Sequence, residues 1–143
     1  MKLRRHPRRL VRRLWPRARP AITPRLTAVA PEFARELELL LTQARRPGLV
    51  ASIPTLEIFG RCPCSDLACA SFFTAPWRED ALTLWVRVWT TIPLPAARGE
   101  VSIDVTDDGI VAVEVLNRRD VWLSLARLPL EAADDAAQAN GRQ

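Results

Sequence analysis

Hydrophobic residues recur at helical spacing in one stretch of the chain, residues 31–45. Phe33, Leu37, Leu40, Leu41 and Ala44 share one side of a helix. Pro31 suits the first helical position, where its missing N–H costs nothing, and Pro47-Gly48 suits the end. The pattern therefore predicts an amphipathic helix that begins at Pro31, ends near Arg45 and packs against a sheet.

The next stretch predicts β-structure, because apolar and polar residues alternate in short runs between turn-forming residues. The predicted strands are 49–53 with 56–59, 69–74, 82–92, 101–106 and 110–116. Pro54 interrupts the first run, which predicts an edge strand or a bent one, because proline lacks the N–H that a central strand needs. Residues 60–67 are predicted to form a loop, and Pro93 and Pro95 to end the longest strand.

Residues 101–116 contain the clearest hairpin signal. Asp107-Asp108-Gly109 separates two alternating apolar runs, and the central residues of such a turn take positive φ, which Asp and Gly tolerate. The alternation predicts an inward face formed by Val101, Ile103, Val105, Val111, Val113 and Val115.

A second helix is predicted after the hairpin, with Asn117 as its N-cap and Pro129 at its end. Its apolar face would consist of Val121, Leu125 and Leu128. The expected fold class is therefore α+β: an N-terminal helix, an antiparallel sheet of about five strands and a C-terminal helix. We expect one domain over residues 31–130 and a polar, disordered tail over residues 131–143.

Positive charge is concentrated at the N-terminus. Residues 1–28 hold ten basic side chains and no acidic one, whereas residues 29–143 hold 11 basic and 16 acidic side chains, a net charge of −5. We expect residues 1–30 to be a disordered Pro/Arg-rich arm, with residues 1–28 dispensable for folding. Such an arm would bind nucleic acid or anionic lipid through phosphates, in a salt-sensitive way. A solubilising tail and a true translation start at Val29 are the alternatives, and together they outweigh the binding interpretation.

The chain lacks the features of a membrane or secreted protein. No apolar run approaches the roughly 20 residues that a spanning helix needs. The basic N-terminus is not followed by the apolar segment of a signal peptide, because Pro16, Arg17 and Pro20 interrupt it. These features favour a cytoplasmic location, where cysteines stay reduced.

All three cysteines of the chain fall within one short segment, at Cys62, Cys64 and Cys69. Thiolates are strong ligands for zinc, and Asp66 is the nearest oxygen donor in the sequence. A closed zinc site needs four ligands, however, and the only histidine is His6 in the arm. The alternative is that Cys69 packs as a small apolar group and the other two are loop thiols. The incomplete ligand count favours this alternative, so zinc is a possible cofactor rather than the expected one.

Trp85, Arg87 and Trp89 share one face of the predicted strand 82–92. If that face is exposed, the arginine between two indoles would form a platform for a base, a peptide or a protein partner. A sheet with two amphipathic helices usually has such a face covered, and we favour the covered arrangement.

No motif indicates an enzyme. The predicted domain contains no histidine and no tyrosine, which removes the commonest general base and one common acid. Five glycines in all leave no room for a phosphate-cradling loop or a dinucleotide fingerprint, and neither occurs. The sequence therefore favours a protein that is not an enzyme.

Two segments resemble uncharacterised bacterial proteins. The hairpin 101–117, VSIDVTDDGIVAVEVLN, and the preceding DALTLWVR are similar to small bacterial domains of unknown function, in which an ALYIRL-type strand precedes a hairpin ending in V-G-I-E-I-L. Ala112 stands where that family usually has glycine. Residues 59–69, FGRCPCSDLAC, resemble a G-R-C-x-C segment of uncharacterised actinobacterial-type proteins. The resemblance implies a small α+β domain and transfers no activity.

Two functions remain open from the sequence. The first is a small cytoplasmic binding or regulatory domain with an unknown protein partner and an unknown oligomeric state. The alternative is a zinc-stabilised domain whose basic arm binds nucleic acid non-specifically.

Overall fold

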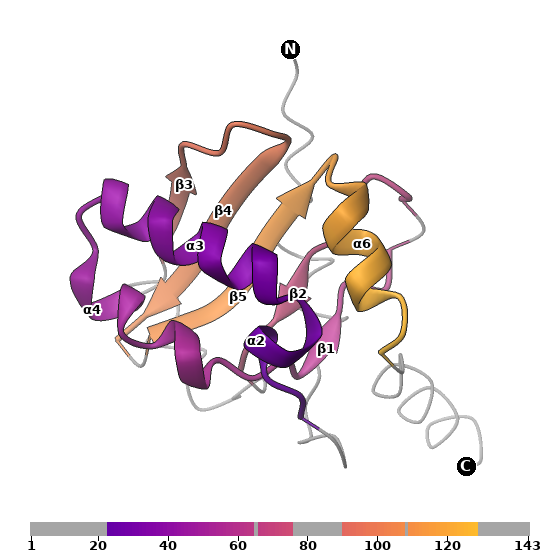
Figure 1. The fold of residues 1–143 in the computed structure, drawn as a ribbon, viewed down its shortest axis with the longest axis horizontal. Coiled ribbons are helices and arrows are strands. Elements are labelled where there is room, and N and C mark those ends of the chain that lie inside the picture. Colours follow the sequence, from indigo (N-terminus) through magenta and orange to yellow (C-terminus); the bar gives the residue numbers. More distant parts are fainter. Residues whose placement is uncertain (1–22, 65, 76–89, 108, 129–143) are drawn as a thin grey trace, which may run out of the picture.

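The longest helix of the described residues crosses one face of a five-stranded antiparallel sheet (Figure 1). The computed structural model describes residues 23–64, 66–75, 90–107 and 109–128. The helices in these ranges are α2 (Leu26–Val29), α3 (Pro31–Gln43), α4 (Pro47–Val50), the 3-10 turn η1 (Ile53–Thr55) and α6 (Arg119–Leu125). The strands are β1 (Gly60–Arg61), β2 (Phe72–Phe73), β3 (Thr90–Leu94), β4 (Glu100–Thr106) and β5 (Gly109–Leu116). They lie in the order β1-β2-β5-β4-β3, so the α+β class is confirmed.

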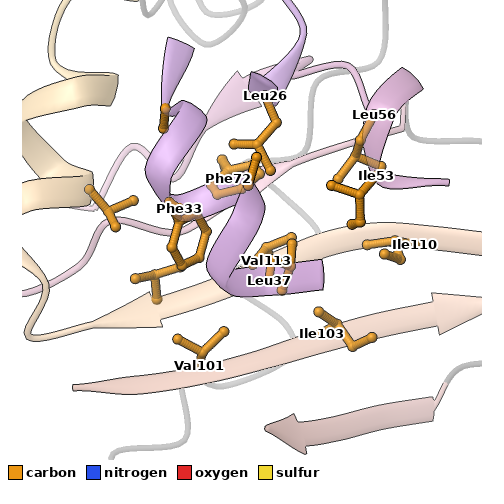
Figure 2. Packing of buried hydrophobic residues seen from close by; sticks show 14 of the residues in the cluster. Leu26, Phe33, Leu37, Ile53, Leu56, Phe72, Val101, Ile103, Ile110 and Val113 are labelled. Atoms are coloured by element: carbon orange, nitrogen blue, oxygen red, sulfur yellow. The ribbon is translucent and has the colours of Figure 1, made fainter. Parts of the chain in front are cut away.

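The core lies between α3 and the sheet. Phe33 and Leu37 project from α3 towards the strands, where Val113 and Phe72 meet them (Figure 2). The rings of Phe33 and Phe72 are 6.4 Å apart in an edge-to-face arrangement, which aromatic pairs favour. Five residues of α3 are buried, and four of them belong to the predicted apolar face. The helix prediction is confirmed, with the end two residues earlier than expected.

Residues 49–53 do not form the predicted strand. Pro47 begins α4 and Pro54 lies within η1, because proline's fixed φ suits the first turn of a helix as well as an edge strand. Ile53 is fully buried by this arrangement. A short apolar run does not by itself distinguish a strand from a buried helical turn, which is why the pattern was misinterpreted.

The folded region begins before residue 31. The Leu26 N–H donates to the Leu56 carbonyl at 2.9 Å, the Ile58 N–H donates to the Pro24 carbonyl at 2.8 Å, and Arg25 and Glu57 form a β-bridge. These bonds place the Leu26 side chain in the core with no exposed surface. The described fold therefore begins by Pro24, before the predicted arm boundary at residue 30. That residues 1–28 are dispensable for folding stays a prediction, and the burial of Leu26 argues against it.

The hairpin prediction is confirmed by β4 and β5, which pair from Glu100↔Leu116 to Thr106↔Gly109. An irregularity in register lies where Asp104 pairs with Ala112 and Val105 with Ile110, which leaves Val111 as an extra residue. Ile110 therefore joins the core cluster instead of Val111. The inward face was wrong at that position, because one inserted residue reverses the alternation beyond it.

Among the described strands, β3 lies at the sheet edge and pairs with β4 alone. It continues through Pro93, opposite Ser102, to Leu94, so Pro93 does not end the strand as predicted. An edge strand tolerates proline because the outer side of its backbone needs no partner. Residues 82–89 of the predicted strand lie outside the described residues.

A buried arginine, Arg118, joins α3, α6 and the segment before β4. Its Nη1 and Nη2 donate to the two Glu36 oxygens at 2.8 and 2.7 Å, and its Nε and Nη2 donate to the Asp120 oxygens at 2.9 and 2.8 Å. The side chain is 2% exposed, and its guanidinium lies 5.6 Å from the Phe33 ring centroid. Two paired carboxylates offset the cost of burying this charge. Gly99 is required beside it, since a Cβ there would collide with the Leu116 carbonyl oxygen and the Arg118 side chain.

Asn117 does not cap α6. It takes a left-handed conformation at φ 57°, and Arg118 occupies the N-cap position without a side-chain cap bond. Asparagine tolerates this region better than most residues, so it turns the chain out of β5. Asp120 lies in the first helical turn as predicted, but its carboxylate binds Arg118.

No helix in the described part of the chain combines the length and hydrophobicity needed to cross a membrane.

Replacing Gly109 with valine is expected to lower the free energy of unfolding by about 1–3 kcal/mol, because a β-branched residue is strained at φ 111°. Open space surrounds the missing Cβ, so the effect isolates backbone strain. Gly48→Ala is the matched control: its Cβ also meets open space and its φ is ordinary, so it should be neutral or slightly stabilising. Urea denaturation measures both variants, and equal midpoints for Gly109→Val and wild type would contradict the turn geometry.

Asp120→Asn is expected to remove a pH-dependent part of the stability. Hydrogen bonds from Arg118 lower the pKa of Asp120 from 3.8 to about 2, so its contribution is complete above about pH 5 and is lost as the pH falls towards 2. At neutral pH the loss should be about 1 kcal/mol, allowing for solvent screening of a carboxylate that is 48% exposed. Denaturant titrations from pH 2 to 7 should show wild type and variant converging at the acid end. Asp107→Asn, at the exposed hairpin turn, is the control; a constant gap between Asp120→Asn and wild type would contradict the pairing.

Candidate metal centre

The three cysteines are brought together by the connection between β1 and β2. These strands pair as Gly60↔Phe73 and Arg61↔Phe72, and the Cys62 N–H extends the ladder by donating to the Ser71 carbonyl at 2.8 Å. Cys62 therefore lies directly after β1, opposite the residues that lead into β2. The loop was predicted over residues 60–67, but it begins two residues later, at Cys62, because Gly60 and Arg61 form β1.

Cys69 is attached to the sheet on the other side of this connection. It forms a β-bridge with Leu116, and the neighbouring Ala70 N–H donates to the Val115 carbonyl at 2.8 Å. Its side chain is buried, whereas Cys62 and Cys64 are half-buried. Cys69 is buried, as the sequence predicted, but the strand predicted over 69–74 is shorter: β2 covers only Phe72–Phe73, and Cys69 precedes it in an isolated bridge.

A tight turn closes the loop between the cysteines. The Asp66 Oδ1 accepts a hydrogen bond from the Ala68 N–H at 2.9 Å, and the Asp66 carbonyl accepts one from the Cys69 N–H at 3.0 Å. Such a turn is a common role for aspartate in loops. Asp66 thus reverses the chain so that Cys69 returns towards Cys62, and its carboxylate does not belong to the group of ligand atoms formed by the cysteines.

The three Sγ atoms all lie within 4.8 Å of one another, and all three are free thiols. Zn–S bonds of about 2.3 Å place two sulfurs of a tetrahedral site roughly 3.8 Å apart. Even a pair at the 4.8 Å limit would need to approach by only about 1 Å to share an ion. A donor set of three thiolates suits soft or borderline ions such as zinc. The residues therefore fit a metal, although the ligand count in the sequence favoured the metal-free interpretation.

The pKa values of the three thiols differ when no metal is bound. Hydrogen bonds from the Cys62 thiol and from Ser71 lower the pKa of Cys69 to about 5 despite its burial. The same bond to Cys69, together with burial, raises the pKa of Cys62, and burial raises that of Cys64. Metal binding must displace the remaining protons, so affinity should weaken as the pH falls.

Ser71 positions this cluster, and the sequence analysis did not identify it. Its Oγ lies 3.3 Å from the Cys69 Sγ and accepts a hydrogen bond from the Val115 N–H at 3.0 Å. Its carbonyl holds Cys62 as described above. The sequence did contain a signal for the contact between Ser71 and Cys69. The two residues are two positions apart, and alternate residues of a strand share one face.

Arg61 links the site to the C-terminal helix. Its guanidinium carbon lies 5.8 Å from the ring centroid of Trp122 in α6, within the range of a cation–π contact. Trp122 is half-buried and packs against the core cluster. Arg61, the residue directly before Cys62 in the sequence, therefore places its positive charge against the Trp122 ring.

The other predicted site residues are not placed. Trp85, Arg87 and Trp89 lie outside the described residues, as do His6 and the basic arm up to residue 22. The tryptophan platform and the arm therefore stay predictions.

Comparison with protein-family models, curated proteins and solved structures finds no match to this chain.

Proposed function

We propose that this chain is a small metal-binding domain in which Cys62, Cys64 and Cys69 hold a zinc ion, and in which the ion stabilises a binding or regulatory domain rather than an enzyme. The observation that supports the proposal is the convergence of three thiol sulfurs within 4.8 Å of one another. Three sulfurs from an eight-residue stretch would not meet this closely in an extended chain.

The way the site is attached to the fold supports a structural role for the ion. Cys69 belongs to the sheet through its bridge to Leu116, and Cys62 follows β1. Strands β1 and β2 have only two residues each. A metal bond between their connecting ends would fix a short hairpin that has few hydrogen bonds of its own. Binding energy of this kind adds to the folding free energy.

The sequence supports a role outside catalysis. Its single histidine, His6, lies outside the described residues, so no imidazole from the described residues accompanies the thiols as a base. Under this proposal the domain acts through binding to another molecule, with a protein as the expected partner.

Elemental analysis of protein purified without a metal-affinity step tests the proposal. We expect about one zinc ion per wild-type chain and its loss in Cys62→Ser and Cys64→Ser. Each variant should also be less stable, by about 3 kcal/mol when free zinc exceeds its dissociation constant a hundredfold. Leu67→Ala, an 81% exposed residue of the same loop, is the matched control and should keep its metal. A wild-type protein that takes up no zinc, with three thiols freely reactive in the native state, would end the proposal.

A second function, non-specific binding of nucleic acid, is favoured by the charge distribution. Residues 1–22 hold nine basic side chains and no acidic one, and they precede the first anchored residues of the fold. A chain that starts at Thr23 changes the net charge from +5 to −4 and keeps Leu26. It should unfold cooperatively and lose low-salt affinity for DNA, since phosphate contacts dominate such binding.

A chain that starts at Val29 is the informative comparison. It lacks Leu26, a fully buried core residue, and should be less stable by at least the roughly 2–5 kcal/mol of a large-to-small core substitution. Fluorescence anisotropy with a labelled oligonucleotide measures binding, and circular dichroism measures stability. DNA affinity that survives in the Thr23 chain would remove the arm as the binding element.

A further inference from the structure

We infer that the three-cysteine site keeps one coordination position open, and that this position takes a thiol from a molecule outside the chain. The inference rests on the proposed metal site and specifies its ligand. It begins from the donor count: within the described residues the cluster offers three sulfurs and no fourth ligand. Closed zinc sites have four protein ligands, whereas sites with three keep the fourth position for water or an incoming molecule.

Two polar side chains that flank the cysteines in the sequence, those of Asp66 and Ser71, are engaged elsewhere. The Asp66 carboxylate accepts the Ala68 N–H and helps to form the loop turn. The Ser71 hydroxyl is 3.3 Å from the Cys69 sulfur, but it accepts the Val115 N–H within the sheet. A neutral hydroxyl in contact with a ligand sulfur acts as an outer-shell group that orients that sulfur. Neither side chain therefore completes the coordination of an ion in this arrangement.

Burial leaves an approach to the site. Cys69 is 6% exposed and lies within the sheet, whereas Cys62 and Cys64 are half-buried. Leu67, in the same loop, is 81% exposed. An incoming ligand would therefore reach the ion past the two loop cysteines, and Leu67 offers an apolar contact to the body of that ligand.

The donor chemistry indicates a thiol. A site of three sulfurs favours a fourth soft donor over a hard carboxylate oxygen. On binding, the thiol loses its proton to solvent, a bond forms between its sulfur and the ion, and a water is displaced. No electrons are transferred.

Cobalt-substituted full-length protein tests the inference, because cobalt(II) bands report the number and type of its ligands. The probe is 2-mercaptoethanol, with acetate and imidazole at equal concentrations for comparison. We expect a saturable spectral change with one thiol per cobalt and at least a tenfold weaker response to acetate and to imidazole. A spectrum that all three probes leave unchanged, or equal responses to all three, would overturn the inference.

Two substitutions at one position sharpen the test. Ser71→Cys introduces a fourth sulfur beside Cys69 and should fill the open position, so cobalt stays bound and the response to 2-mercaptoethanol disappears. Ser71→Ala adds no ligand, so the cobalt that it binds should still take one thiol, while loss of the hydroxyl beside Cys69 should weaken cobalt binding. A Ser71→Cys protein that binds cobalt and still responds like wild type would contradict the inference. If Ser71→Cys does not fold, the wild-type titration alone decides.

Two further experiments test whether His6 or a second copy of the chain already supplies a fourth ligand to the metal. His6→Ala should leave the cobalt spectrum unchanged, and sedimentation should show that loading with cobalt does not cause dimerisation. A changed His6→Ala spectrum, or a metal-dependent dimer, would show that this chain or a second copy already fills the position. If neither cobalt nor zinc binds, the proposed metal site is contradicted. If metal binds but no thiol does, only the inference of an open coordination position is contradicted.

Discussion

The buried guanidinium of Arg118 is the interaction on which the arrangement of the helices depends. It forms paired hydrogen bonds with Glu36 of α3 and Asp120 of α6, and it lies over the Phe33 ring. A charge that is 2% exposed requires those partners, since the loss of either leaves part of the desolvation cost uncompensated. The guanidinium therefore fixes α3 relative to α6, and Gly99 keeps the neighbouring backbone close enough to enclose it.

Strand β5 connects this structural centre to the candidate metal site. Its last residues precede Arg118, and Leu116 forms the bridge to Cys69. The Val115 N–H donates to the Ser71 hydroxyl that contacts the Cys69 sulfur. Strand β5 thus contributes residues to the core, precedes the buried ion pair and supports the thiol cluster. A change that loosens the end of β5 is therefore expected to lower both the stability of the fold and its affinity for metal.

The cluster combines a rigid part with a more accessible one. Cys69 is held by the sheet, whereas Cys62 and Cys64 flank Pro63 in a half-buried loop. Rigid ligands lower the entropy cost of binding, and an accessible edge allows ligands to exchange. This division suits a site that holds an ion firmly and presents it to other molecules. Ligand counting, which favoured the metal-free interpretation, assumes a closed site, whereas the proposed open site needs only three protein ligands.

The sequence by itself determined the features that depend on local spacing. The helix at Pro31–Gln43, the hairpin around Asp107-Asp108-Gly109 and the α+β class followed from periodicity and turn chemistry, because neighbouring residues decide them. Only the tertiary structure decided the features that join distant segments. It placed Leu26 in the core, paired Arg118 with Glu36 across 82 residues of sequence and joined the cysteine loop to the end of β5 through the bridge between Cys69 and Leu116. These contacts form because folding closes long loops to bury apolar surface and pair charge, and no local pattern encodes which distant partners will meet.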